Sequence, residues 1–181
     1  MSIATRGGDG GKTGLLHGQR VAKDHPQIEA VGAFDALNVE IGAARLGASG
    51  ESTRQALLQI QRTLVALMGE LACAEENAAA HIQSRRFALL SEADLALLDA
   101  QVAALESKRL KFDGWATPGG NPVALAFDRA RIAARAAERR LAALPAAGRN
   151  VRPLLLQWTN RLSDVLWLLA REAENSPAAQ A

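Results

Sequence analysis

Residues 57–71 read LLQIQRTLVALMGEL, and this stretch decides the fold. Apolar side chains recur in it at intervals of three and four, which places them on one face of an α-helix. That face needs a neighbouring helix to cover it from water. We therefore expect a helix over residues 52–75 that packs in a bundle. The positions on its apolar face are Leu57, Ile60, Leu64, Leu67 and Leu71.

The rest of the chain has the same helical spacing between clear helix breakers. Pro26 and the pair Asn121-Pro122 are typical of helix starts, and Ser91 followed by Asp94 resembles a capping box. Strong helix formers dominate after residue 26, and β-branched runs are scarce. The sequence therefore predicts an all-α bundle of about five helices joined by short connections. The other helices are expected at 26–47, from 91 to a break at 112–121, at 122–144 and at 153–174, with 77–90 as a loose connection.

Composition excludes several classes of protein. The 181 residues are enough for one domain, and 49% are hydrophobic, 22% are charged and the net charge is +2. So balanced a charge does not favour nucleic acid or an anionic membrane surface as a partner. No apolar stretch is long enough to cross a bilayer, no apolar leader is visible, and Cys73 has no second cysteine for a disulfide. We expect a cytoplasmic protein without nucleic-acid or membrane partners.

The segment 5–14, TRGGDGGKTG, is a glycine-rich loop with one lysine and two threonines. Glycine allows successive backbone N–H groups to converge on an anion. The order of Gly, Lys and Thr does not match a Walker phosphate loop, and no βαβ unit accompanies it. Residues 1–24 are therefore either a flexible arm or a phosphate-binding loop.

A polar stripe runs along the helix expected at 122–144. Asp128, Arg131, Arg135 and Glu138 lie at helical spacing, about a quarter turn from the apolar face. Half-buried arginines in such a position need partners. Two interpretations remain: surface salt bridges, which contribute little stability, or one wall of a polar cleft. The polar residues on the first and last helices that could complete a cleft are Asp35, Asn38, Asn160, Ser163 and Asp164.

The remaining reactive side chains give weak signals. His17, His25 and His81 are isolated and lack metal-ligand spacing, so we expect surface or loop positions for them. Cys73 follows an apolar helical face, which is typical of an inert packing residue. The tryptophans expected in the core are Trp158 and Trp167.

Four blocks of sequence together resemble the PduO-type ATP:cob(I)alamin adenosyltransferase family. Any one block is a weak signal, but four in order at suitable spacing are specific. The resemblance extends over roughly residues 3–171. The blocks are Thr-x-x-Gly-Asp-x-Gly-x-Thr at 5–13; RVAKDHP at 20–26 with DALN at 35–38; PGG at 118–120 leading to AR at 130–131 and RAAER at 135–139; and NRLSD at 160–164.

The resemblance implies a five-helix bundle of the ferritin-like, cobalamin adenosyltransferase-like type, forming a homotrimer with active sites between subunits. It implies one domain over 1–174, made of an ATP-binding loop at 1–24 and helices at 26–174, followed by a disordered tail at 175–181. The implied reaction moves the 5′-deoxyadenosyl group of ATP to cob(I)alamin and releases triphosphate. ATP and the corrinoid are substrates, and Mg²⁺ would bridge phosphate oxygens with no direct protein ligand assigned.

The resemblance also implies roles for individual residues. Asp35 and Arg131 match an ion pair that shapes the corrinoid side of the site. Trp115 lies three residues before Pro118, where the family commonly has a phenylalanine wedge that displaces the lower axial ligand of cobalt. With Arg135, these residues form the expected catalytic group. The expected ATP-binding residues are Thr5, Arg6, Gly7, Gly8, Thr13, Gly14, Lys23, Arg135, Ala136, Ala137, Glu138, Arg139 and Asn160.

The sequence departs from the family pattern at several positions. Ala136 replaces the second arginine of an RRAER block, Ala36 replaces the glutamate of DELN, and Val39 replaces a serine. The missing arginine removes a charge-assisted contact of roughly 1.5–3 kcal/mol. The alternative hypothesis is therefore a non-catalytic ATP- or corrinoid-binding protein that delivers adenosylcobalamin, and a third is a purely structural helical oligomer. Candidate protein partners are a cobalamin reductase and an adenosylcobalamin-dependent enzyme.

Overall fold

The computed structural model describes residues 4, 6–84, 87–111 and 115–175. This part of the chain contains six α-helices, one short 3-10 helix and a two-stranded hairpin. In chain order these are β1 Lys12–Gly14, β2 Arg20–Ala22, α1 Pro26–Gly47, α2 Glu51–Leu71, α3 Glu75–Gln83, α4 Glu92–Glu106, α5 Pro122–Ala143, η1 Pro145–Ala147 and α6 Pro153–Asn175.

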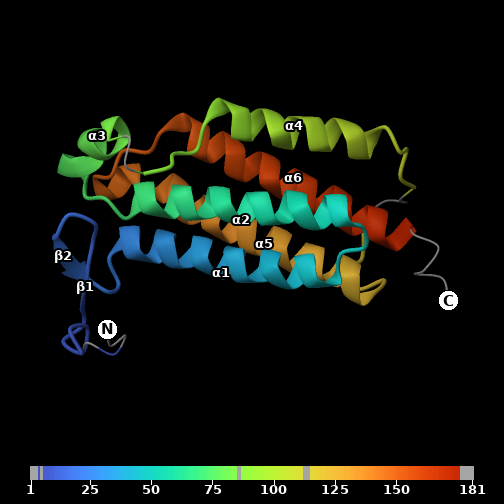
Figure 1. Ribbon diagram of the computed structural model, residues 1–181. Helices are drawn as coiled ribbons and strands as arrows, with labels where there is room; N and C mark the ends of the chain where they lie inside the picture. The colour runs from blue at the N-terminus through green and yellow to red at the C-terminus, as the bar shows by residue number, and fades with distance from the viewer. Residues whose placement is uncertain (1–3, 5, 85–86, 112–114, 176–181) are drawn as a thin grey trace.

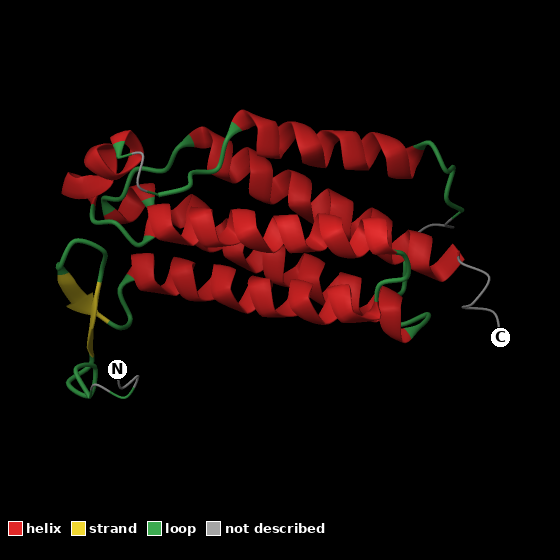
Figure 2. Cartoon of the chain, in the orientation of Figure 1, coloured by secondary structure: helices red, strands yellow, loops and turns green. Residues whose placement is uncertain are grey.

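The long helices lie side by side, and the hairpin and α3 lie together at one end of the bundle (Figure 1). Helix α5 packs against both α1 and α6, α1 packs against α2, and α4 packs against α6. Helices account for nearly all of the regular structure in the described residues (Figure 2). The predicted all-α bundle is therefore confirmed.

The apolar face of residues 57–71 lies in the core, as predicted. Leu57, Leu64, Leu67 and Leu71 are fully buried, and Ile60 is nearly so. The opposing side chains come from the other helices of the bundle and include Phe34, Leu37, Ile41, Leu141, Trp158, Leu162 and Leu166.

Capping residues fix the helix starts that the sequence predicts. The carboxylate of Asp94 accepts hydrogen bonds from the backbone N of Ser91 at 2.9 Å and from its Oγ at 2.6 Å. Asn121 Oδ1 accepts a hydrogen bond from the backbone N of Ala124 at 2.9 Å, and Asn121 Nδ2 donates to the carbonyl of Ala173 at 3.1 Å. Asn121 therefore caps α5 and also holds its first turn against the last turns of α6.

Helix α2 ends at Leu71 rather than at residue 75, and residues 75–83 form a helix instead of a loose connection. The structure thus has six α-helices in its described part, one more than predicted. The side chain of Arg149 explains the break, because it donates to the carbonyls of Glu70 and Cys73 at 3.0 and 3.1 Å. Helix α3 is short and buries only Ala78 and His81, so it has too few apolar residues for a periodic signal.

Residues 12–22 form an antiparallel hairpin, which the prediction of a loop over 1–24 missed. Lys12 pairs with Ala22, and Gly14 pairs with Arg20. The turn needs left-handed backbone at His17 (φ 71°) and Gly18 (φ 96°), and a single His-Gly pair between such short strands is too weak a signal to predict a hairpin. The backbone N of Leu16 donates to the carbonyl of Ala72 at 2.8 Å, so the turn is attached to the end of α2.

Helix α6 continues through Asn175, the first residue of the expected tail, and the rest of that tail, 176–181, lies outside the described residues. Within the described ranges, no helix combines the length and the apolar character needed to span a membrane.

Candidate active site

Helix α5 carries the polar stripe that the sequence predicts. Asp128 is 1% exposed, Arg131 and Glu138 are half-buried, and Arg135 is exposed. The stripe therefore passes from the core to the surface along the helix. Because Asp128 is buried at the α5–α6 contact, the interpretation as surface salt bridges fails at that position.

One end of the stripe borders a hollow of about 260 Å³. Trp115 contributes to its rim and is 95% exposed, so its indole contributes little to the core of the single chain. The hollow brings together two residues that are expected to act on the same substrate, Trp115 and Arg131. Its lining residues are Trp115, Ala116, Pro118, Asp128, Arg131, Trp167 and Arg171.

Two arginines share the carboxylate of Asp128 at the base of this hollow. Arg171 Nη2 donates to Asp128 Oδ2 at 2.6 Å, and Arg131 Nε donates to Asp128 Oδ1 at 3.2 Å. The guanidinium of Arg171 also lies 5.6 Å from the ring centroid of Trp167. Arg171 Nη2 also lies 3.1 Å from Glu174 Oε1, so two carboxylates balance the two guanidinium groups and the hollow is polar without a net charge from these four residues.

Arg171 was not among the predicted site residues. Trp167, which was expected in the core, is half-buried: it packs against the core and also lines the hollow, whereas Trp158 is in the core as predicted. A signal for Arg171 existed, because it is a lone cation that follows an apolar run at 165–170 and needs a buried partner.

Two further arginines of α5 remain free. Within the described residues, neither Arg135 nor Arg139 has an ion-pair or hydrogen-bond partner, and both are exposed. Their neighbours on the same helix are engaged, since Arg140 pairs with Glu29 at 3.6 Å and Arg129 pairs with Glu40 at 2.8 Å. Unpaired cations on a rigid helix are available to a phosphate ligand.

Asn160 lies on α6 at the level of Arg139 on α5. The two helices run antiparallel, with Asp128 paired to Arg171. Eleven residues separate Asp128 from Arg139, and eleven separate Asn160 from Arg171. The two side chains are thus at matching heights, about 16 Å along the bundle from the Asp128–Arg171 pair.

The glycine-rich loop is held in shape by the residues that follow it. Arg20 Nη2 donates to the carbonyls of Gly7 and Lys12 at 2.6 and 3.2 Å. A Cβ placed on Gly8 would lie only 3.1 Å from Lys23 Nζ, so this ammonium group lies against the loop. The glycine-rich loop and Lys23 were predicted to bind the same ligand, and the structure places them next to each other. Thr5, another residue of the predicted site, lies outside the described residues.

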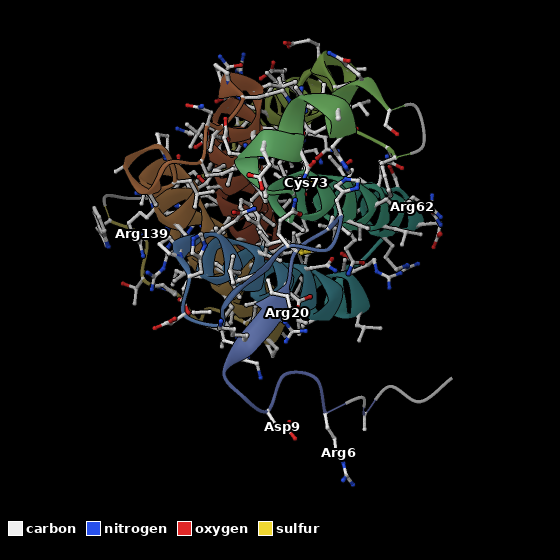
Figure 3. All side chains as sticks on the ribbon, turned by 90° about the vertical axis from the view of Figure 1, so that its left-hand side faces the viewer. Arg6, Asp9, Arg20, Arg62, Cys73 and Arg139 are labelled. Carbon is white, nitrogen blue, oxygen red and sulfur yellow. The ribbon has the colours of Figure 1, made fainter. Side chains whose placement is uncertain are left out.

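The single chain does not bring all of the predicted residues together. Viewed from the hairpin end, Arg6 and Asp9 lie on a loop that extends away from the helices and from Arg139 (Figure 3). Asp35 is exposed on α1, and within the described residues it forms no ion pair with Arg131, whose partner is Asp128.

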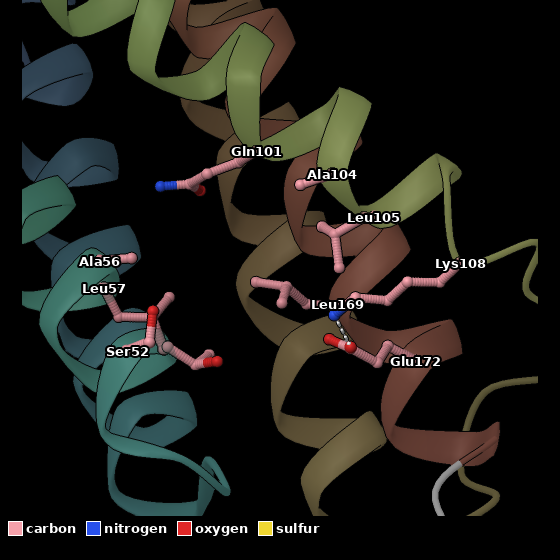
Figure 4. Close-up of a pocket in the computed structure, with 10 residues that line it drawn as sticks. Ser52, Ala56, Leu57, Gln101, Ala104, Leu105, Lys108, Leu169 and Glu172 are labelled. Atoms are coloured by element: carbon pink, nitrogen blue, oxygen red, sulfur yellow. Dashed lines mark hydrogen bonds and ion pairs between the residues drawn. The ribbon is translucent and has the colours of Figure 1, made fainter.

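A second hollow, between α2, α4 and α6, contains none of the predicted site residues (Figure 4). An ion pair between Lys108 and Glu172 lies at one end of it. Apolar and amide side chains line most of the rest, including Leu57, Leu105 and Gln101. This hollow offers no group of reactive or phosphate-binding residues.

The histidines are not isolated, contrary to the prediction. The ligand atoms of His17, Cys73 and His81 lie within 4.8 Å of one another, and His81 and Cys73 are buried. His17, which is exposed on the hairpin turn, and His25 do have the expected surface or loop positions, and only the buried His81 departs from them among these three. His25 Nδ1 accepts a hydrogen bond from the backbone N of Gln27 at 3.3 Å at the start of α1. The prediction failed because the cluster joins segments far apart in the sequence.

Comparison with known proteins gives a consistent result. The family described as cobalamin adenosyltransferase matches residues 3–173. The chain is 39% identical over 181 residues to the corrinoid adenosyltransferase PduO of Salmonella typhimurium, covering 100% of this chain and 52% of that protein. It is 38% identical over 171 residues to the cobalamin adenosyltransferase of Cupriavidus metallidurans, covering 93% and 86%. The chain spans about half the length of the PduO relatives from Salmonella typhimurium and Citrobacter freundii.

Solved structures agree with the sequence matches. A single-residue variant of the PduO-type ATP:corrinoid adenosyltransferase from Lactobacillus reuteri, complexed with cobalamin and ATP, superposes with a TM-score of 0.84. Its sequence is 26% identical, and the match covers 96% of this chain and 94% of that one. Another variant of the same protein, complexed with ATP, gives a TM-score of 0.83.

Proposed function

Because this chain belongs to the cobalamin adenosyltransferase family, we propose that it transfers the 5′-deoxyadenosyl group of ATP to the cobalt(I) of a reduced corrinoid. Cobalt(I) attacks C5′ with its electron pair, the bond between C5′ and the triphosphate oxygen breaks, and triphosphate leaves with the bonding electrons. The protein positions both substrates and stabilises the anion that leaves.

The observation that carries this proposal is the arrangement of arginines on α5. Arg131 lines the hollow beside Trp115, and Arg135 and Arg139 follow it on the same helix without partners in the described chain. Four and eight residues correspond to about 6 and 12 Å of helix. Helix α5 would therefore carry Arg131 at the hollow proposed for the corrinoid and, further along the same helix, Arg135 and Arg139 for the triphosphate of ATP.

The proposed nucleotide site combines the glycine-rich loop with these cations. The loop's N–H groups and Lys23 would bind the phosphates, and Asn160 would contact the nucleotide near Arg139. Asp9 is the single carboxylate in the described segment 6–14, and it is exposed, so Mg²⁺ would arrive bound to ATP and water. The full set is Thr5, Arg6, Gly7, Gly8, Thr13, Gly14, Lys23, Arg135, Ala136, Ala137, Glu138, Arg139 and Asn160.

The proposal includes a homotrimer whose sites lie between subunits. The loop extends away from the Arg139 of its own chain, which favours its contact with a neighbour. Asp35 shares a stripe of α1 with Val39 and Leu46, which are 68% and 84% exposed. An apolar stripe of this kind is typical of an interface. A neighbouring chain on this face could bring its Arg131 to Asp35, which is the ion pair that the resemblance implies.

Product analysis tests the function directly. Incubation with ATP, Mg²⁺ and prereduced cobalamin should give adenosylcobalamin and triphosphate in equal amounts. Formation of ADP and phosphate instead would identify an ATPase and would contradict the proposal. Binding of both substrates without any product would favour the delivery protein that Ala36 and Ala136 suggest.

A further inference from the structure

His17, Cys73 and His81 meet where the hairpin turn, the end of α2 and α3 come together. Their ligand atoms lie within 4.8 Å of one another, although the residues are 56 and 8 positions apart in sequence. None of the three belongs to the proposed nucleotide or corrinoid site. We propose that they form a binding site for a divalent transition metal, most suitably Zn²⁺, that fastens the hairpin to the bundle.

The imidazole of His81 is the strongest indication of a missing ligand. The residue is 1% exposed, yet neither Nδ1 nor Nε2 has a hydrogen-bond partner among the described residues. A buried imidazole without a partner loses the hydrogen bonds that it makes with water in the unfolded chain. A metal ion would satisfy one of these nitrogens.

The orientation of His81 is fixed by aromatic neighbours. Its ring stacks on Phe87 with centroids 4.6 Å apart, and the ring of His17 meets it edge-on at 6.0 Å. Burial lowers the pKa of His81, so the imidazole is neutral near pH 7 and keeps a lone pair for a metal. After burial, the charge of His17 also lowers the pKa of His81, while Glu70 raises it and Arg149 lowers it.

The backbone holds His17 beside the cluster. Its φ of 71° is in the left-handed region, and the neighbouring Leu16 donates to the carbonyl of Ala72 at 2.8 Å. This hydrogen bond attaches the hairpin turn to Ala72, the residue directly before Cys73. A non-glycine residue in such a conformation is uncommon and costs energy, so the surrounding contacts must hold it there.

The donor set fits zinc. One thiolate and two imidazoles are typical zinc ligands, with metal–ligand distances of about 2.0–2.3 Å. In a tetrahedral site, ligand atoms are roughly 3.3–3.7 Å apart, so the observed cluster needs a contraction of about 1 Å. Cys73 donates only a weak hydrogen bond, from Sγ to the carbonyl of Gly69 at 3.6 Å, which metal binding would replace. Water would occupy the fourth position beside the exposed His17.

Such a site would stabilise the segment that precedes α1. The hairpin follows the glycine-rich loop directly, and the loop is tied to the hairpin by Arg20 and Lys23. A metal at the turn would therefore limit the motion of the loop without touching its ligand. The binding test is independent of adenosyl transfer, so its failure and the failure of the proposed function are distinguishable.

Metal titration of the full chain, without a histidine tag, tests the proposal. The metal-free protein should bind one Zn²⁺ per chain in competition with a chromophoric chelator. Free Co²⁺ in place of zinc should give the near-ultraviolet charge-transfer band of a cobalt–thiolate bond. A free Zn²⁺ concentration 100-fold above Kd should raise the Tm of the protein by about 5–10 °C.

Two mild variants and one control make the test specific. His17→Asn keeps a residue that tolerates positive φ, and Cys73→Ser is nearly isosteric, so both should fold. Both should weaken zinc binding by more than about 10–100-fold, which is the loss typical of removing a residue that only orients a metal ligand. Cys73→Ser should also lose the charge-transfer band, because that band requires the thiolate. His25→Asn removes the remaining histidine but keeps a good helix cap, and it should bind zinc like the parent chain.

The outcomes are decisive in both directions. Stoichiometric binding that depends on His17 and Cys73 but not on His25 would establish the site. Absence of zinc binding at micromolar metal, or equal binding by the parent chain and the His17→Asn and Cys73→Ser variants, would overturn it. Equal losses in His25→Asn and His17→Asn would also overturn it, because they would indicate adventitious binding to histidine.

Discussion

Arg171 on α6 and Asp128 on α5 form a buried ion pair, with Nη2 and Oδ2 2.6 Å apart and both side chains at most 2% exposed. The same carboxylate accepts a hydrogen bond from Arg131, which lines the hollow beside Trp115. A contact in the core therefore sets the position of a residue in the proposed site. Arg171 is a positioning residue in this arrangement.

We predict that Arg171→Leu destabilises the fold by about 3–5 kcal/mol, because it leaves the carboxylate of Asp128 with less compensation in the core. Urea unfolding measures the loss. The control is Arg129→Leu, which removes the exposed pair with Glu40 and should cost less than about 1 kcal/mol. Equal losses in the two variants would contradict a structural role for the buried pair.

Arg135→Ala should remove most ATP-dependent turnover while the helices remain intact. Loss of one charge-assisted contact to triphosphate corresponds to roughly 1.5–3 kcal/mol, or about 10–150-fold in kcat/KM. Arg140→Ala is the matched control, since it removes the same charge from the same helix but from a residue that pairs with Glu29. Near-normal turnover in the Arg135 variant would count against the proposed site.

Trp115→Ala should slow the reaction that starts from cobalt(II) far more than the one that starts from prereduced cobalt(I). The proposed wedge displaces the lower ligand, and four-coordinate cobalt(II) is easier to reduce. Because Trp115 is 95% exposed, the free energy of unfolding should change by less than about 0.5 kcal/mol. Trp115→Phe should retain the activity from cobalt(II), and equal losses from both oxidation states in the alanine variant would exclude the wedge.

Arg20→Ala should raise KM for ATP with a smaller effect on kcat. The side chain binds the carbonyls of Gly7 and Lys12, so its removal releases the loop without deleting a proposed phosphate contact. Two hydrogen bonds to a charged group at an exposed position suggest a change of about 5–30-fold. Steady-state kinetics measures the KM for ATP, with Arg62→Ala, which removes an exposed arginine of α2, as the control. An unchanged KM in the Arg20 variant would show that Arg20 does not order the loop.

Leu46→Glu should dissociate the proposed trimer. Leu46 is 84% exposed in the single chain, and a charge buried between subunits is costly. Sedimentation or light scattering gives the mass, with Leu97→Glu on α4 as a control that is also exposed, at 54%. A trimeric Leu46 variant would place the interface elsewhere.

The helix starts were predictable because they depend on local chemistry. Pro26, Ser91 with Asp94, and Asn121 with Pro122 mark the starts of α1, α4 and α5 in the sequence as they do in the structure. The apolar face at 57–71 was equally local. By contrast, the end of α2 depends on Arg149, which donates hydrogen bonds to the carbonyls of Glu70 and Cys73, 79 and 76 positions away in the sequence.

The site was only partly predictable for the same reason. The stripe of α5 follows from helical spacing, so the placement of Arg131 and Arg135 along one side of that helix could be predicted, while their roles in the site remain proposals. The partner of Asp128 is on another helix, and the grouping of His17 with His81 depends on a turn in left-handed backbone. Spacing along one helix cannot reveal contacts of this kind.

The most direct test of adenosyl transfer is an anaerobic assay with chemically reduced cobalamin, ATP and Mg²⁺, in which absorbance follows formation of the cobalt–carbon bond. We predict a rate that is proportional to protein concentration and that Arg135→Ala lowers by about 10–150-fold. No product from a folded, substrate-binding protein would contradict the proposed activity and would favour a protein that only binds or delivers the cofactor.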